Sequence, residues 1–283
     1  MWSRKTVAFP FICCIICFHA TAQHIESNSE RERIFAFEVK HIDEFFERFN
    51  DEPDAFINAY VKDNYPGITV DRGSLISNLF NKQNKNWNEN EVADFYNQVT
   101  DSVNPVFLDF ISEHWYAEAL CKFEYNGKMI DVVILLKIQH DADGGSKWTI
   151  AGAYSRFITP VKYPIAFQHE YRGIKFLNPM SHATNFLSLS SALRDKPNIR
   201  DYLDTNFIHY PASRAFLRAV LNNQLKYRFV KNVVYHFLQV DGWIFTISRF
   251  SRPSVNSGWL ISNLKKASDR EKDAYVLRLL HAQ

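Results

Sequence analysis

Residues 115–140 read WYAEALCKFEYNGKMIDVVILLKIQH, two runs rich in aromatic and β-branched residues on either side of Asn126-Gly127. Asn-Gly between such runs is among the strongest local signals for a β-hairpin, because both turn positions need a positive φ. The first run also alternates, and its core-like face carries Trp115, Ala117, Ala119, Cys121 and Phe123. The stretch therefore predicts an antiparallel hairpin with one buried face.

The segments before and after this hairpin complete a first unit. Apolar residues recur at helical spacing over 34–49, 53–61, 72–82 and 88–99, and a Gly-ended turn leads into a third aromatic-rich run at 147–157. The first half thus reads as helices followed by a three-stranded antiparallel meander.

The second half repeats that order. Helices are predicted at 181–194, 197–203 and 212–223, and strands at 226–240, at 243–251 and through Trp259 to Ile261. Asp241-Gly242 separates the first two strands, and a charged segment over 268–280 predicts a closing helix.

Two segments of the chain echo each other. SHATNFLSLSSALRD (181–195) and KHIDEFFERFNDEPD (40–54) belong to an alignment in which identical residues stand 141 positions apart, namely His41/His182, Phe45/Phe186, Asp54/Asp195, Asn81/Asn222 and Gln83/Gln224. The offset shrinks only in connecting segments, which is typical of a duplication. Trp148 and Trp259 are 111 apart, and each is followed two residues later by Ile.

These patterns predict an α+β chain of two tandem units, each with helices packed on a curved antiparallel sheet. The expected boundaries are 1–22 for a signal peptide, 30–160 and 163–266 for the units, and 267–283 for a C-terminal helix. Residues 34–265 resemble the nuclear transport factor 2-like superfamily of cystatin-like α+β cones, and specifically tandem proteins of this kind exported by Bacteroides-type bacteria. The resemblance implies a pocket between the helices and a bent sheet.

The N-terminus predicts export. Arg4 and Lys5 precede the apolar run VAFPFICCIICF, and Ala20-Thr21-Ala22 offers a small-x-small cleavage site. Cleavage after Ala22 would place the chain in the periplasm or outside the cell. The alternative, a lipoprotein modified at Cys17, is less favoured because the usual Leu and small residues do not precede it.

Composition narrows the range of partners. Cleavage would remove three of the four cysteines and leave Cys121, so no intramolecular disulfide is expected. The formal charge of +2 resides in the signal peptide, and the neutral remainder carries no electrostatic footprint for nucleic acid. After the signal peptide, no apolar run is long enough to span a membrane.

Two sets of residues are candidates for a site. His236 and Asn232 share a predicted strand face with aliphatic residues, and a half-buried imidazole there could act as a base, although a structural histidine is the simpler explanation. The aromatic residues predicted on the meander strands could line a cavity for an apolar ligand or a sugar: Trp148, Tyr154, Trp243, Phe245 and Trp259. A filled core, or the contact between the two units, is the favoured explanation of the same aromatic residues.

The remaining polar residues favour structural roles. His41 and His182 lie near predicted helix starts and suit capping, and the turn itself demands polar residues such as Asp141 and Asp143 beside His140. No metal site and no cofactor are expected. The sequence favours a non-catalytic module that binds a small apolar ligand, a glycan or a partner protein; the alternative is a cofactor-free isomerase, cyclase or hydrolase acting on a small hydrophobic substrate. The oligomeric state is left open.

Overall fold

The computed structural model describes residues 28–140, 144–162, 173 and 175–281. The predicted signal peptide, the turn residues Asp141 and Asp143, and position 163, the predicted start of the second unit, lie outside the described residues. Within the described part of the chain, no helix is long and apolar enough to cross a lipid bilayer.

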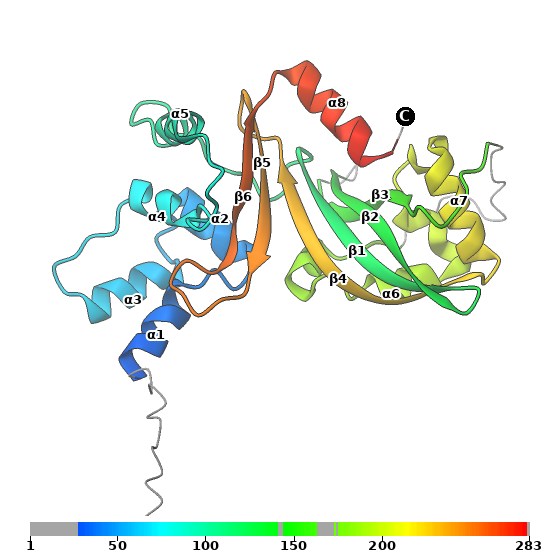
Figure 1. Cartoon of the computed structure of the whole chain (residues 1–283), viewed down its shortest axis with the longest axis horizontal. Helices are drawn as coiled ribbons and strands as arrows, with labels where there is room; N and C mark the ends of the chain where they lie inside the picture. The colour runs from blue at the N-terminus through cyan, green and yellow to red at the C-terminus, as the bar shows by residue number, and fades with distance from the viewer. Residues whose placement is uncertain (1–27, 141–143, 163–172, 174, 282–283) are drawn as a thin grey trace, which may run out of the picture.

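The centre of the molecule is one antiparallel sheet with the strand order β3-β2-β1-β4-β5-β6 (Figure 1). Its strands are β1 (Trp115–Tyr125), β2 (Lys128–His140), β3 (Ser146–Tyr154), β4 (Leu225–Phe237), β5 (Trp243–Phe250) and β6 (Gly258–Lys266). The predicted α+β class and both predicted meanders are therefore present.

The β1–β2 hairpin follows from its sequence. Asn126 and Gly127 have φ values of 49° and 77°, and Tyr125 pairs directly with Lys128. The predicted inner face of β1 is fully buried from Trp115 to Phe123. On the opposite face, Lys122 Nζ lies 2.6 Å from an Asp131 carboxylate oxygen on β2, the cross-strand charge pattern of a solvated surface.

The prediction of two separate sheets is wrong, because β1 and β4 join the two meanders. They pair antiparallel from Trp115 opposite Phe237 to Tyr125 opposite Leu225. Each is the first strand of its meander and would otherwise leave a row of backbone groups unpaired beside an apolar face. By contrast, β4 and β5 share only three residue pairs, around His236 and Thr246, so the sheet is narrowest there.

Helices flank both ends of the sheet. The first half contributes α1 (Asn28–Phe37), α2 (Ile42–Asn50), α3 (Phe56–Asn64), α4 (Arg72–Leu79) and α5 (Glu89–Val99). The second contributes the 3₁₀ helices η1 (Pro179–Thr184), η2 (Lys196–Tyr202) and η3 (Phe207–His209), with α6 (Leu189–Arg194), α7 (Pro211–Leu221) and the closing α8 (Asp269–Leu279). The helix predicted over 181–194 is split in two, because Asn185 and Phe186 adopt left-handed φ values of 47° and 56°.

The helices of each half cover the outermost strand of the other half. Helices α2, α4 and α5 pack against β6, whereas η1, η2, η3 and α7 pack against β3. Figure 1 shows the same crossing, with α4 and α5 on the side of β5 and β6, and α7 on the side of β2 and β3. The two halves are interlocked.

Backbone hydrogen bonds close both sheet edges, and the strand residues that make them correspond in the sequence comparison, since Trp148 and Trp259 are 111 apart and each is followed two residues later by Ile. At the β6 edge, Trp259 N–H donates to Val39 O (2.8 Å) and Asn81 N–H donates to Ile261 O (3.0 Å). At the β3 edge, Trp148 N–H donates to Leu177 O (3.1 Å) and Asp204 N–H donates to Ile150 O (2.9 Å). We call these contacts the β6 seam and the β3 seam.

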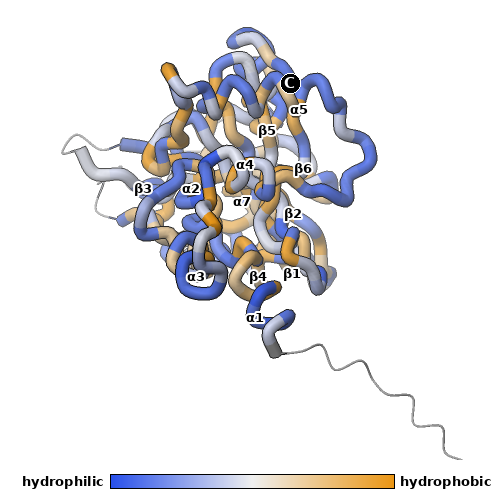
Figure 2. Tube along the Cα trace, turned by 90° about the vertical axis from the view of Figure 1, so that its left-hand side faces the viewer, coloured by the Kyte–Doolittle hydropathy of each residue, from blue (hydrophilic) through white to orange (hydrophobic). Residues whose placement is uncertain are grey.

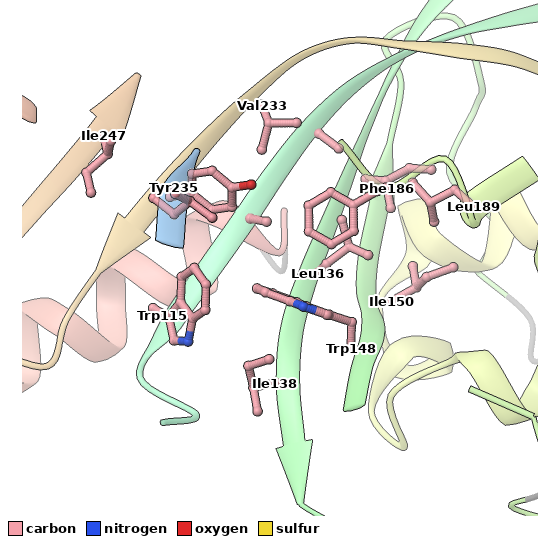
Figure 3. Packing of buried hydrophobic residues seen from close by; sticks show 14 of the residues in the cluster. Trp115, Leu136, Ile138, Trp148, Ile150, Phe186, Leu189, Val233, Tyr235 and Ile247 are labelled. Carbon is pink, nitrogen blue, oxygen red and sulfur yellow. The ribbon is translucent and has the colours of Figure 1, made fainter. Parts of the chain in front are cut away.

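One hydrophobic core runs between the seams and includes residues of both halves. The rings of Trp148 and Trp115 are 4.9 Å apart, those of Trp115 and Tyr235 are 5.7 Å apart, and those of Tyr235 and Trp259 are 5.1 Å apart. Figure 3 shows Trp148, Trp115 and Tyr235 in this chain of contacts. Hydrophilic residues gather instead on the outer loops (Figure 2).

Candidate functional site

The aromatic residues predicted to line a cavity lie mostly in the core. Trp148, Trp243, Phe245 and Trp259 are at most 5% exposed and contact other core side chains. Tyr154 differs, because its ring stacks on His281 at 3.8 Å near the end of the chain. Ligand binding by the four core residues stays a prediction, and it would require the core to open.

His236 is buried on the sheet face that α8 covers. Its Nδ1 lies 2.7 Å from the Tyr275 hydroxyl of α8, and its Nε2 lies 3.5 Å from a Glu118 carboxylate oxygen on β1. The nearby His236 imidazole lowers the pKa of Glu118 although burial opposes the shift. Burial, followed by the Glu118 charge, raises the pKa of Tyr275 to about 12. The cluster thus combines an imidazole, a carboxylate and a neutral phenol.

The other predicted member of that site stands apart from His236. Asn232 is exposed and pairs with Leu120, whereas His236 pairs with Tyr116. Four residues along a strand correspond to about 13 Å. Irregular pairing of β4 with β1 near Lys231 and Arg228 also interrupts the alternation, and Phe229 is exposed.

The recurring histidines do not act as helix caps. His41 occupies the N-cap position of α2 but makes no side-chain cap bond. His182 is buried within η1, where Nδ1 lies 2.8 Å from Pro179 O and Nε2 lies 2.8 Å from an Asp43 carboxylate oxygen. This second contact joins η1 to α2 and so connects the two halves, which replaces the predicted capping role.

Cysteine chemistry and metal binding find little support in the described residues. Cys121 is buried, and burial raises the pKa of its thiol to about 12, so it packs as a small hydrophobic side chain, as predicted. Among the described residues, no three His, Cys, Asp or Glu side chains are grouped to hold a metal ion.

An aromatic cavity lies between α4 and α5, away from the predicted site residues. The α4–α5 groove has a volume of about 740 Å³, and three aromatic side chains line it: Phe80, Trp87 and Tyr96. Phe80 is buried, while Trp87 and Tyr96 are partly exposed. The groove therefore presents aromatic surface to solvent, which the core aromatics do not.

Local contacts hold the aromatic rings of the groove. The Trp87 indole N–H donates to Asn81 O at 2.9 Å, and its ring meets Phe80 edge-on at 5.6 Å. Gly73 leaves room for Tyr96, because a Cβ atom at Gly73 would lie 2.3 Å from the Tyr96 hydroxyl oxygen. Replacing this glycine would displace the ring.

The α4–α5 groove carries both neutral and charged polar groups. Ser74, Ser77 and Asn84 supply hydroxyl and amide groups, and the charged residues at the rim are Lys82, Lys85 and Glu89. Lys82 Nζ donates to Asn78 Oδ1 at 2.6 Å and is therefore already engaged. Such a lining can stack a flat apolar surface and hydrogen-bond to hydroxyl groups.

Sequence reasoning did not select Trp87, although a signal was present. The segment 81–90 reads NKQNKNWNEN, with a single Trp among Asn, Lys, Gln and Glu. A large aromatic residue in such a polar connection has few apolar sequence neighbours, which indicates a surface role.

Comparison with protein-family models, curated proteins and solved structures finds no match to this chain.

Proposed function

We propose that this chain is an exported, non-catalytic binding protein that holds a carbohydrate in the α4–α5 groove. The observation that carries the proposal is the pair of partly exposed rings, Trp87 and Tyr96, beside neutral hydroxyl and amide groups in one cavity. A sugar has a C–H face that stacks on an aromatic ring and hydroxyl groups that pair with Ser and Asn side chains. The cavity volume of about 740 Å³ is within the usual range for small-molecule sites.

The anchoring of Trp87 supports binding with little reorganisation. Its partner Asn81 is buried, and the Asn81 amide oxygen accepts a hydrogen bond from Arg252 at 2.9 Å. The indole is thereby fixed through the β6 end of the sheet. A ring held in place before the ligand arrives loses less side-chain entropy on binding.

Titration calorimetry with cellohexaose, xylohexaose, chitohexaose and maltohexaose tests the proposal. At least one of these should bind, and Trp87→Ala should weaken that binding tenfold or more, a loss of about 1.4 kcal/mol or greater. Because Trp87 also packs against Phe80, Ala93→Arg provides a second variant that fills the groove from an exposed position on α5. The matched control is Asn97→Arg, on the same helix but outside the groove lining.

Two results would reject the carbohydrate assignment. One is the absence of binding to all four oligosaccharides by the folded wild-type protein. The other is binding that Ala93→Arg and Asn97→Arg reduce equally, since only the first of these variants occupies the groove.

We also propose that the chain consists of two duplicated units of the nuclear transport factor 2-like type. The matching seams support this. The backbone N–H groups of Trp148 and Trp259 donate equivalent hydrogen bonds, and the carbonyl oxygens of Ile150 and Ile261 accept equivalent hydrogen bonds. Pairing of β1 with β4 joins the two meanders into the single sheet, and in this proposal the covering helices are exchanged between the units.

Export is the third element of the proposal. It rests on the basic end, the apolar run and the Ala20-Thr21-Ala22 site. Mass spectrometry should show that the mature chain begins at Gln23. A lipid-modified Cys17 would instead anchor the protein to a membrane surface.

A cofactor-free enzyme is the second candidate, favoured by the meeting of His236 with Tyr275 and Glu118. An imidazole, a carboxylate and a neutral phenol can share proton transfers on a small ketone or ester. Screening a panel of such substrates tests it: any turnover should disappear in His236→Gln, while the unfolding midpoint shifts little. Turnover that survives in His236→Gln would exclude this cluster as the catalytic site.

A further inference from the structure

A second cavity lies beneath α8, on the sheet face opposite the main core. Tyr116, which lines it, alternates along β1 with the core residues Trp115 and Ala117. The cavity has a volume of about 640 Å³, and we call it the α8 pocket. It is separate from the α4–α5 groove, since the two share no lining residue.

The floor of the α8 pocket is apolar and aromatic. Ala151, Leu238 and Leu280 are buried there, and the rings of Tyr116 and Tyr210 are partly exposed at its walls. Burial, and secondarily the Asp204 charge, raises the pKa of Tyr116 to about 12 and raises that of Tyr210 as well. Both phenols are therefore neutral at ordinary pH, and their ring faces can attract a cation.

In the α8 pocket the lysines have bonding partners, whereas most of the carboxylates make no ion pair with a described residue. Both lysines are engaged: Lys137 Nζ lies 2.7 Å from an Asp204 carboxylate oxygen, and Lys272 Nζ donates to the carbonyl oxygens of Leu238 and Val240, each at 2.9 Å. The other carboxylates at the rim make no ion pair within the described part of the chain: Asp241, Asp269 and Asp273.

We propose that the α8 pocket binds an organic amine, with its apolar body on the floor and its ammonium group at the carboxylate rim. Asp204 offsets the Lys137 charge, so the three remaining carboxylates face only the charge of Lys272, which carbonyl groups bind but do not neutralise. The net negative charge favours a cation and disfavours an anion. The floor favours an apolar body over a bare inorganic ion, which could not use that surface. The phenol rings add attraction for the ammonium group, so each part of the lining matches one part of the ligand.

Three probes with the same body and different head groups test the charge preference. They are 4-phenylbutylamine, 4-phenylbutan-1-ol and 4-phenylbutyrate, titrated into the full chain and followed by calorimetry or by NMR. The amine should bind about tenfold or more tightly than the alcohol, and the acid should bind most weakly, because one charge interaction at the rim is worth about one factor of ten. Equal affinity for the amine and the alcohol, or no saturable binding of the amine at millimolar concentration, would overturn the proposal.

Variants then locate the site. The double variant Asp269→Asn with Asp273→Asn changes two exposed side chains of α8 and should weaken amine binding about threefold to tenfold without changing alcohol binding. The control Asp63→Asn removes an exposed carboxylate from α3 and should leave the affinity unchanged. An unchanged affinity in the folded double variant, or an equal loss in Asp63→Asn, would overturn the assignment to the α8 pocket.

Discussion

The two edges of the sheet are closed by equivalent backbone contacts but by different side chains. At the β6 seam, Val39 lies so close to Gly258 that a Cβ atom there would stand 2.1 Å from Val39 O, and Gly258 has a φ of 85°. Buried Asn256 then donates to the carbonyl oxygens of Asn78 and Phe80, at 3.0 and 2.9 Å. At the β3 seam, an ion pair between Lys137 and Asp204 performs the corresponding task.

This difference shows which parts of the closure are general. Both outer strands present free backbone groups, so each needs a covering segment, and the interlocked helices bring one from the other half. The side chains that fix each segment are local solutions. The β6 seam relies on close approach and on the Asn256 amide, which also accepts from the Arg252 guanidinium at 2.7 Å, whereas the β3 seam relies on an ion pair. The two should therefore respond differently to substitution.

The largest effect is expected from Gly258→Ala at the β6 seam. The new methyl group collides with Val39 O, and Ala is strained at this φ, so we expect a loss of about 4 kcal/mol in the free energy of unfolding. Gly67→Ala is the matched control, because Gly67 has a φ of 89° with nothing within 4 Å of its added Cβ. Gly67→Ala should lose only the stability that is due to backbone strain at a positive φ, about 1–2 kcal/mol. Equal losses by urea denaturation would mean that close approach to Val39 contributes nothing.

Asn256→Ala should have the next largest effect, a loss of about 3 kcal/mol in the free energy of unfolding, again measured by urea denaturation. The substitution leaves the carbonyls of Asn78 and Phe80 and the N–H of Lys82 without their amide partner. Asn97→Ala, at an exposed position of α5, should change stability by at most about 0.5 kcal/mol. A small loss in Asn256→Ala would show that the β6 seam holds through its backbone bonds alone.

The strands and turns were predictable from the sequence because their signals are local. Alternation gave the buried face of β1, and Asn126-Gly127 gave the hairpin. The pairing of β1 with β4 was not predictable in this way, because it joins residues a hundred or more positions apart and both first strands look alike as edges.

The candidate sites were predictable only in part. Strand alternation placed His236 on the face that α8 covers, but its partner Tyr275 comes from a distant helix. The strand aromatics favoured a filled core without excluding a cavity wall, because both require the same residue types. The α4–α5 groove depends on how two helices pack, and the spacing of apolar residues in the sequence does not predict that packing.

Asp204→Asn tests the β3 seam and should lower the free energy of unfolding by about 1–2 kcal/mol. The amide can still accept from Asn206 N–H, as the carboxylate does at 2.9 Å, so the loss reports mainly the ion pair with Lys137. Asp94→Asn breaks the exposed pair with Lys266 and should cost at most about 0.5 kcal/mol. If the two variants lose equally little, charge does not hold the β3 seam and the contrast with the β6 seam disappears.

The smallest change in the free energy of unfolding is expected for Tyr235→Phe. The Tyr235 ring connects the two seams through its contacts with Trp115 and Trp259. Its hydroxyl is buried, and among the described residues it has no hydrogen-bond partner. Removing it in Tyr235→Phe keeps the ring contacts and relieves an unpaired polar group, so the variant should be unchanged or more stable by up to about 1 kcal/mol.

The pH dependence of Tyr235→Phe provides the sharper test of whether the seams are linked by apolar contact alone. Burial, followed by the Asp43 charge, raises the pKa of Tyr235 in the folded state. Above pH 10 the unfolded tyrosine releases its proton while the folded one keeps it, so the wild type loses stability as the pH rises and the Phe variant is spared this loss. The advantage of the variant should therefore grow by about 1.4 kcal/mol per pH unit above pH 10. A variant that is less stable at neutral pH, with no such growth, would reveal a polar partner for this hydroxyl and a polar link between the seams.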